Sequence, residues 1–216
     1  MLLLALDTAT PAVTVALHDG AAVVAEECAV DRRRHGELLA VFIDKALRSS
    51  GATRQDVTAI AVGTGPGPYT GLRAGLVTAQ VLASALRIRI DGVCSLDVIA
   101  AAARDEAAGA EFLVATDARR REVYWARYSA AGERSYGPQV SRPADLPPGL
   151  AVAGEAALIY PDLSDRLLEP AFPSAARLAA IAAGRLARGE RPQPAVPLYL
   201  RKPDAREPGK PKRVTP

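Results

Sequence analysis

The stretch "LLLALDTATPAVTVA" at residues 2–16 has a second, weaker copy, "FLVATDARRREVYWA", at residues 112–126. At an offset of 110 the copies share five identical pairs: Leu3/Leu113, Ala5/Ala115, Asp7/Asp117, Val13/Val123 and Ala16/Ala126. Each copy has the pattern of a buried strand, an acidic turn and a second strand, and a further turn follows at Gly20 or Gly132. The repeat predicts two related α/β halves, each opening with a three-stranded antiparallel meander.

Apolar residues at helical spacing mark three further segments. The first spans residues 37–50, and Gly51 is placed to end it. The second follows Thr70, which we expect to be its N-cap residue. The third, "SAARLAAIAAGRLARG", is expected to be capped by Ser174 and ended by Gly189. Helices and strands therefore mix in both halves, as an α/β fold requires.

These patterns suggest a division of the chain. We expect an N-terminal α/β half at residues 1–106 and a second half at residues 107–200, whose last segment could pack back on the first half. A proline-rich connector leads to residues 201–216, which read as a basic flexible tail.

The composition favours a soluble globular protein, with 49% hydrophobic and 24% charged residues. The sequence has neither an apolar run long enough for a membrane span nor the marks of a signal peptide, so we expect a cytoplasmic protein. Cys28 and Cys94 lie far apart without a CxxC motif, which favours reduced, buried thiols over a disulfide or zinc site.

Positive charge is concentrated in short clusters, although the net charge is only +3. The clusters are "DRRRH" at residues 31–35, the triplet Arg119–Arg121 in the second acidic turn, and the tail from Arg201. Each is compatible with a solvated loop or tail, and each could instead meet phosphate groups or an acidic partner.

The segment "GTGPGPYTGLRAGL" at residues 63–76 resembles a phosphate loop at first sight. It fits neither the Walker pattern nor G-x-G-x-x-G, and Pro66 and Pro68 lack the N–H groups that a phosphate cradle uses. We therefore expect a stiff strand-to-helix turn, with direct phosphate binding as the alternative. Gly71 and Gly75, four residues apart, would let another helix approach closely.

Asp7 and Asp117 are the candidate cofactor-binding residues, because a carboxylate in a turn after a strand can hold a hydrated Mg²⁺. The alternative is that each carboxylate only accepts hydrogen bonds within its own turn. His35 fits a capping or surface residue better than a catalytic base, since no nucleophile or second ligand accompanies it. HExxH and GxSxG are missing, so the sequence nominates no catalytic residue and no metal site.

Five segments together resemble one known family: "LLALDTAT" at 3–10, "RHGELL" at 34–39, "GTGPGPYTGLRAGLVTAQVLA" at 63–83, "TDARRREVYWARY" at 116–128 and "PLYLRKP" at 197–203. The family is that of the bacterial TsaB (YeaZ) proteins, which are non-catalytic subunits of the machinery that makes N6-threonylcarbamoyladenosine at position 37 of tRNA. The resemblance implies an actin-like/Hsp70-like/sugar-kinase (ASKHA) fold with two RNase-H-like halves, and no cofactor.

The resemblance also implies partners. These are the paralogous transferase TsaD as a heterodimer, the ATPase TsaE, and a possible second copy of the chain, with tRNA reached only through the complex and no membrane. The contact would be made by the helices that start near Glu37 and Gly71. The implied partner-binding residues, which periodicity alone would assign to a core, are Leu38, Leu39, Phe42, Gly71, Leu72, Gly75, Leu76 and Ala79. On this view Gly75→Leu would disrupt association and leave the monomer folded.

Two departures from the family pattern stand in the same region. Related proteins usually carry serine after the histidine of "RHGELL", where this chain has Gly36. The catalytic paralogue holds a metal through two histidines four residues apart, whereas here Leu39 follows His35 at that spacing and the other histidine is His18. A two-histidine metal site is therefore not expected.

The leading hypothesis is a non-catalytic dimerisation subunit that activates the transferase and helps to recruit the ATPase. The second is an active nucleotide-dependent ATPase or phosphotransferase of the same fold, with Asp7 and Asp117 on the metal. The third is an RNA-binding module that uses the basic clusters and the tail.

Overall fold

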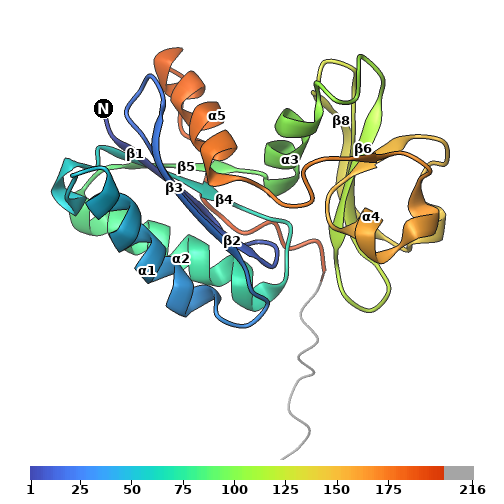
Figure 1. Ribbon diagram of the computed structural model, residues 1–216, viewed down its shortest axis with the longest axis horizontal. Coiled ribbons are helices and arrows are strands. Elements are labelled where there is room, and N and C mark those ends of the chain that lie inside the picture. Colours follow the sequence, from blue (N-terminus) through green and yellow to red (C-terminus); the bar gives the residue numbers. More distant parts are fainter. Residues whose placement is uncertain (202–216) are drawn as a thin grey trace, which may run out of the picture.

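Both expected meanders are present in the computed structural model, which describes residues 1–201 (Figure 1). Each meander forms part of a five-stranded sheet, with strand orders β3-β2-β1-β4-β5 and β10-β9-β6-β7-β8. The first sheet contains β1 (Leu3–Asp7), β2 (Ala12–His18), β3 (Val23–Val30), β4 (Ala59–Gly63) and β5 (Arg89–Val93). The second contains β6 (Phe112–Asp117), β7 (Val123–Tyr128), β8 (Arg134–Ser141), β9 (Ala151–Ala153) and β10 (Leu167–Leu168).

The two sheets pair their strands in the same way, which confirms the α/β fold expected from the repeat. β1 lies antiparallel to β2 and parallel to β4, and β6 lies antiparallel to β7 and parallel to β9. Gly20 and Gly132 occupy the expected turns with φ of +107° and +77°, a backbone conformation that glycine adopts without a steric penalty.

The helices cover the sheets as Figure 1 shows. They are α1 (His35–Ser49), α2 (Tyr69–Leu86), α3 (Ser95–Ala103), α4 (Ala156–Ile159) and α5 (Ala175–Ala187). α1 and α2 pack on one face of the first sheet and α5 packs on the other. β1 is therefore buried on both faces: Leu4 and Leu6 face α1 and α2, while Leu3 and Ala5 face α5. Burial on two sides explains why β1 is continuously apolar instead of alternating.

α5 belongs to the first lobe in space, although it follows the second lobe in the chain. Leu178 and Ala179 join Leu3 and Ala5 in one buried cluster. The helix begins as expected, because the Ser174 side chain accepts a hydrogen bond from the Arg177 N–H at 3.3 Å.

Two helix starts differ from the expectation. α1 begins at His35, two residues before Glu37, and α2 begins at Tyr69, so Thr70 is not an N-cap residue. Pro68 takes that position because its carbonyl accepts the first helical hydrogen bond, from Leu72 N–H at 3.0 Å. Neither helix has a side-chain cap.

The residues expected at a partner interface lie largely inside the chain. Six of them are buried: Leu39, Gly71, Leu72, Gly75, Leu76 and Ala79. Leu38 and Phe42 are half-buried against the same core. The small residues of α2 therefore meet the chain's own β1–β2 turn and, at Gly71, the start of α1, so we now expect Gly75→Leu to disturb the monomer itself. A Cβ atom at Gly75 would stand 2.5 Å from Thr8 Oγ1.

Cys94 is buried but Cys28 is exposed, on the edge strand β3, where it lies opposite Thr14 of β2. Within residues 1–201, no helix combines the length and apolar character that a membrane crossing needs.

Candidate functional site

Asp7, the first candidate ligand, is enclosed by the chain. Its Oδ1 accepts the Ala9 N–H at 2.7 Å, its Oδ2 accepts the Ser95 hydroxyl at 2.6 Å, and the residue is 0% exposed. Burial raises the pKa of Asp7 to about 6, against the opposing effect of the hydrogen bonds from Ser95 and Ala9. In this arrangement Asp7 holds its own turn and the start of α3.

The glycine segment explains why the carboxylate is enclosed. Gly63 and Gly67 pass so close to the β1–β2 turn that a Cβ atom on either would collide with Asp7 or Ala9. The Gly65 N–H donates to Ser95 Oγ at 3.2 Å, and the Thr64 N–H donates to the carbonyl of Val93. The glycines serve close backbone packing, and the segment folds as the stiff strand-to-helix turn that the prolines predict.

Asp117, the second candidate, lies in a more open turn. Its Oδ1 accepts the Arg119 N–H at 2.8 Å, and its Oδ2 lies 3.4 Å from Arg119 Nη1. Its own N–H donates to Glu155 Oε1 at 3.4 Å. The structure thus places Asp7 and Asp117 in different surroundings: one is sealed inside the first lobe and the other is half-buried beside an arginine.

Glu155 was not singled out from the sequence, yet it lies where the two lobes meet. It is 3% exposed, immediately before α4, and its Oε2 is 3.9 Å from Arg32 Nη2 of the first lobe. Burial raises the pKa of Glu155 to about 7, and the hydrogen bond from Asp117 N–H and the charge of Arg32 oppose that rise.

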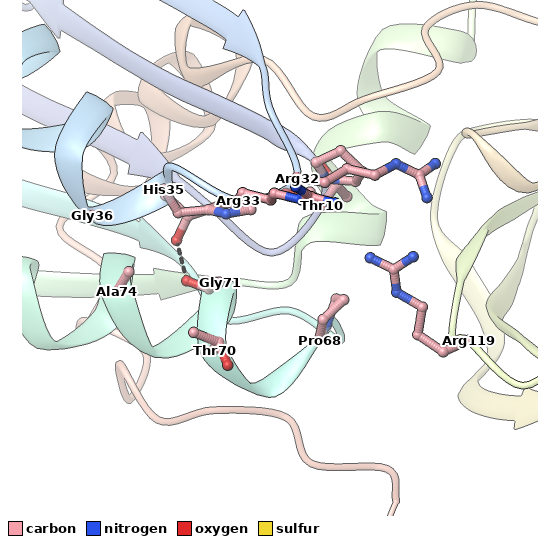
Figure 2. A pocket seen from close by; sticks show the side chains of 12 residues that line it. Thr10, Arg32, Arg33, His35, Gly36, Pro68, Thr70, Gly71, Ala74 and Arg119 are labelled. Atoms are coloured by element: carbon pink, nitrogen blue, oxygen red, sulfur yellow. Dashed lines mark hydrogen bonds between the residues drawn. The ribbon is translucent and has the colours of Figure 1, made fainter.

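A pocket of about 370 Å³ opens beside these groups, between the starts of α1 and α2 and the turn of the second lobe (Figure 2). Its lining residues are Thr8, Thr10, Pro11, Arg32, Arg33, His35, Gly36, Pro68, Thr70, Gly71, Ala74 and Arg119. Arg32, Arg33 and Arg119 come from two clusters that are far apart in the sequence. The structure therefore unites parts of "DRRRH" and of the arginine triplet, and the tail from residue 202 lies outside the described residues.

His35 has a different role from the one expected. It is the first residue of α1, and its Nε2 lies 2.9 Å from the carbonyl oxygen of Thr10. Because a carbonyl only accepts, Nε2 carries the proton and donates it. His35 is thus neither a helix cap nor a purely surface residue: it ties α1 to the β1–β2 turn and lines the pocket.

The β6–β7 turn positions the arginine from the second lobe. Arg119, Arg120 and Arg121 have φ of +61°, +56° and +61°, in the left-handed region that non-glycine residues rarely adopt. Three such residues in succession curl the turn tightly, and Arg119 projects from it toward the first lobe in Figure 2.

A second surface, on the outer side of α1 and α2, carries three exposed valines. Val77 and Val81 of α2 are 53% and 60% exposed, and Val41 of the neighbouring α1 is 57% exposed. Val77 and Val81 lie one turn apart and so share a face. The sequence signal for this surface was indirect, because helical periodicity points to the buried stripe and not to the opposite one.

Comparisons with known proteins agree on one family. A family model described as "TsaD: tRNA N6-adenosine threonylcarbamoyltransferase" matches residues 23–189. An uncharacterized protein of Mycobacterium tuberculosis is 47% identical over 210 residues, covering 94% of this chain and 93% of that protein. The Escherichia coli "tRNA threonylcarbamoyladenosine biosynthesis protein TsaB" is 39% identical over 130 residues, 59% of this chain and 55% of that protein. The solved structure of YeaZ from Pseudomonas aeruginosa superposes with a TM-score of 0.76 and 31% identity, covering 92% of this chain and 99% of that one.

Proposed function

This chain belongs to the TsaD family and, within it, to the TsaB (YeaZ) proteins, with the two-lobed actin-like fold expected of them, and on that basis we propose that it serves the biosynthesis of threonylcarbamoyladenosine in tRNA as a non-catalytic subunit. The proposed place of action is the cytoplasm, where tRNA is modified. The proposal has two parts, an inactive cleft and an assembly surface.

The inactive cleft rests on one observation: both carboxylate oxygens of Asp7 are held by Ser95 and by the Ala9 N–H. A metal ion at this position would have to displace the Ser95 hydroxyl from a fully buried carboxylate. The glycine turn that packs on Asp7 leaves no space for side-chain rearrangement, since Gly63 already approaches too closely for a Cβ atom. This arrangement supports a subunit that does not carry out phosphoryl transfer itself.

The assembly surface is the outer side of α1 and α2. Val41, Val77 and Val81 present apolar area to solvent there, and Leu38 and Phe42 lie half-buried beneath. The three valines are between 53% and 60% exposed, so burying the remainder of each is worth about 1 kcal/mol, and together they can contribute to an interface. We assign this surface to a TsaD-type partner, and to a second copy of the chain when that partner is absent.

Activation then follows from binding. A partner that binds the α1–α2 surface more tightly in its active than in its inactive conformation is shifted toward the active one. The size of the shift is set by the difference between the two binding free energies. The resulting pair, and not this chain alone, would recruit a TsaE-type ATPase and contact tRNA.

Reconstitution of the tRNA modification with purified components tests the proposal. We expect the TsaD-type transferase to be much more active with this chain than without it. Full activity in its absence would refute the activating role. Steady ATP hydrolysis by the isolated chain would refute the non-catalytic assignment and favour the nucleotide-dependent enzyme instead.

A further inference from the structure

We propose that residues 195–201, "AVPLYLR", act as a clamp that holds the two lobes in one relative arrangement and is itself held by an exposed side-chain cluster on α2. The segment follows α5, and these residues form neither helix nor strand. Its position is therefore set by individual contacts and not by a regular hydrogen-bond ladder. It contains most of the segment "PLYLRKP", for which the chemistry of the site gives no role.

The beginning of the clamp is fixed to the first lobe. Ala195 is 8% exposed and belongs to the core cluster of that lobe, and its carbonyl accepts a hydrogen bond from Gln80 Nε2 at 2.8 Å. The residues just before it run along the free edge of β5, where the Gly92 N–H donates to the Gln193 carbonyl at 3.0 Å. A Cβ atom on Gly92 would collide with the Pro194 carbonyl, so the approach is close.

The end of the clamp is fixed to the second lobe. Leu198 packs against the second-lobe core cluster that contains Tyr128. Arg201 Nη1 donates to the Ala118 carbonyl at 3.0 Å, and its Nη2 forms an ion pair with Glu122 Oε2. Ala118 and Glu122 both lie in the β6–β7 turn. The clamp therefore joins the core of one lobe to the core and a turn of the other.

Leu198 contacts both lobes at once. Its N–H donates to the Thr64 carbonyl at 2.9 Å, in the turn that follows β4, while its side chain packs in the second lobe. A change in the arrangement of the lobes would have to break this hydrogen bond or withdraw the side chain from the core. The Leu198 amide is therefore a local reporter of the clamp.

An exposed cluster on the outside of α2 holds the middle of the clamp. It consists of Tyr69, Arg73 and Tyr199: the two rings are stacked with centroids 5.3 Å apart, and Arg73 Cζ lies 3.8 Å from the Tyr69 centroid. Arg73 Nε also donates to the Tyr199 hydroxyl at 2.9 Å. Aromatic and cation–π contacts of this kind hold Tyr199 in place although it is 44% exposed. The cluster can thus be removed without opening a cavity in either core.

The clamp adds a second point of attachment between the lobes. At α3 the Ser95 hydroxyl is bonded to Asp7 of the first lobe, and Ile99 packs in the core of the second. In Figure 1 the chain reaches the end of the clamp well below α3. Two bodies held at one point can turn about it, whereas attachment at two separated points restricts that turn. The ion pair of Arg32 with Glu155, at 3.9 Å, is a weak substitute for the clamp.

The cluster also lies beside the surface assigned above to a partner. Arg73 precedes Val77 by one turn of α2, so their side chains are neighbours on the helix. A protein seated on the exposed valines would then meet the cluster and could alter the clamp. This consequence rests on the proposed function, whereas the clamp is a property of the isolated chain and is tested on it.

Two substitutions open the clamp, and each has a matched control. Tyr199→Ala removes the stacked ring, and Tyr136→Ala removes a tyrosine that is 51% exposed on β8 and packs against Trp125, with centroids 5.5 Å apart. Arg201→Gln removes the ion pair with Glu122.

Its control is Arg104→Gln, which removes an exposed ion pair with Asp105 at the end of α3. Both controls change the same kind of group away from the clamp. Thermal unfolding verifies that each of the four variants is folded.

The lobe arrangement is measured by double electron–electron resonance on the full-length chain. Nitroxide labels are placed on Arg54→Cys in the first lobe and on Leu158→Cys in the second, since both positions are exposed. The exposed Cys28 is replaced by serine, and the buried Cys94 stays unlabelled.

We expect one narrow distance distribution in the parent chain and in both controls. In Tyr199→Ala and Arg201→Gln the distribution should be about twofold broader or more, because the lobes can then turn about α3. The proposal is overturned if either folded clamp variant gives the parent distribution, or if the controls broaden it equally.

Hydrogen exchange distinguishes a clamp from a segment that only stabilises the whole fold. In Tyr199→Ala the Leu198 amide should exchange about tenfold faster or more, while the amides of β1 keep the rates of the parent chain. Equal acceleration at Leu198 and in β1 would show global destabilisation and would also overturn the proposal.

Discussion

Ser95 donates its hydroxyl to the buried carboxylate of Asp7 across 2.6 Å, and this bond joins the start of α3 to the end of β1. Because the bond crosses 88 positions of the chain, it fixes the segment that leads out of the first lobe. The carboxylate that the sequence offers as a metal ligand thus has a structural partner.

The first prediction concerns the pH dependence of stability through Asp7. Burial raises the pKa of Asp7 to about 6, above the unfolded value near 3.9, so folding favours the protonated form. The resulting contribution to the free energy of unfolding is roughly 3 kcal/mol. It is fully present below about pH 4 and is lost as the pH rises through 6. Asp7→Asn should lose less unfolding free energy than the wild type between pH 4.5 and 7.5 in urea titrations. Parallel curves for the two proteins would contradict the assignment.

Glu155 should add a second pH-dependent change in stability, at a higher pH than that of Asp7. Its pKa is raised to about 7 by burial, so its contribution also declines as the pH rises through that value. Arg32 opposes the shift, and Arg32→Gln should therefore move the Glu155 titration to higher pH. Carbon-13 NMR of the side-chain carboxyl measures both, with Glu155→Gln identifying the resonance. A midpoint unchanged by Arg32→Gln would show that the two lobes do not communicate through this pair.

The third prediction tests the close contact between α2 and the β1–β2 turn. The Thr8 hydroxyl donates to the Gly71 carbonyl at 2.7 Å and accepts the Gly75 N–H at 2.9 Å. Gly75→Ala should destabilise the fold by about 1–3 kcal/mol, despite the better helix propensity of alanine, because its Cβ meets that hydroxyl. Thr8→Ala removes the obstruction, so the double variant should be more stable than the sum of the two single effects predicts. Additive losses in urea denaturation would mean that the contact is not the cause.

The fourth prediction concerns the assembly surface. Val81→Asp places a charge on an exposed position of α2, so the monomer should keep its stability while association with a TsaD-type partner weakens about tenfold or more. Leu158→Asp is the matched control, because Leu158 is 62% exposed on α4 of the other lobe. Analytical ultracentrifugation of the mixed proteins measures both. Equal weakening by the two substitutions, or none by Val81→Asp, would exclude this surface.

Local signals made the two sheets predictable from the sequence. The apolar run of β1, the acidic turns and the glycines at 20 and 132 each act over a few residues, and the repeat reinforces them. The start of α2 was less predictable, because two prolines shortly before Thr70 are also compatible with the N-cap position of a helix. Six of the eight residues expected at the interface are buried, since periodicity identifies the face of a helix that packs and gives no information about what covers the other face.

The arginine pocket could not have been assembled from the sequence. Arg33 and Arg119 belong to different halves of the chain, and only the relative position of the lobes brings them to one cavity. The turn at residues 119–121 has a left-handed backbone but contains no glycine, the residue that usually indicates such a conformation in a sequence. Glu155 could not be found from the sequence either, because its contacts with Arg32 and Asp117 join residues that are far apart in the chain.

The return of α5 to the first lobe has a consequence for synthesis on the ribosome. β5 ends at Val93, but the helix that covers Leu3 and Ala5 begins only at Ala175. At 5–20 residues per second, one face of the first sheet stays uncovered for about 4 to 16 s while the intervening chain emerges. The nascent first lobe therefore exposes an apolar face to chaperones and to neighbouring chains until α5 has been synthesised.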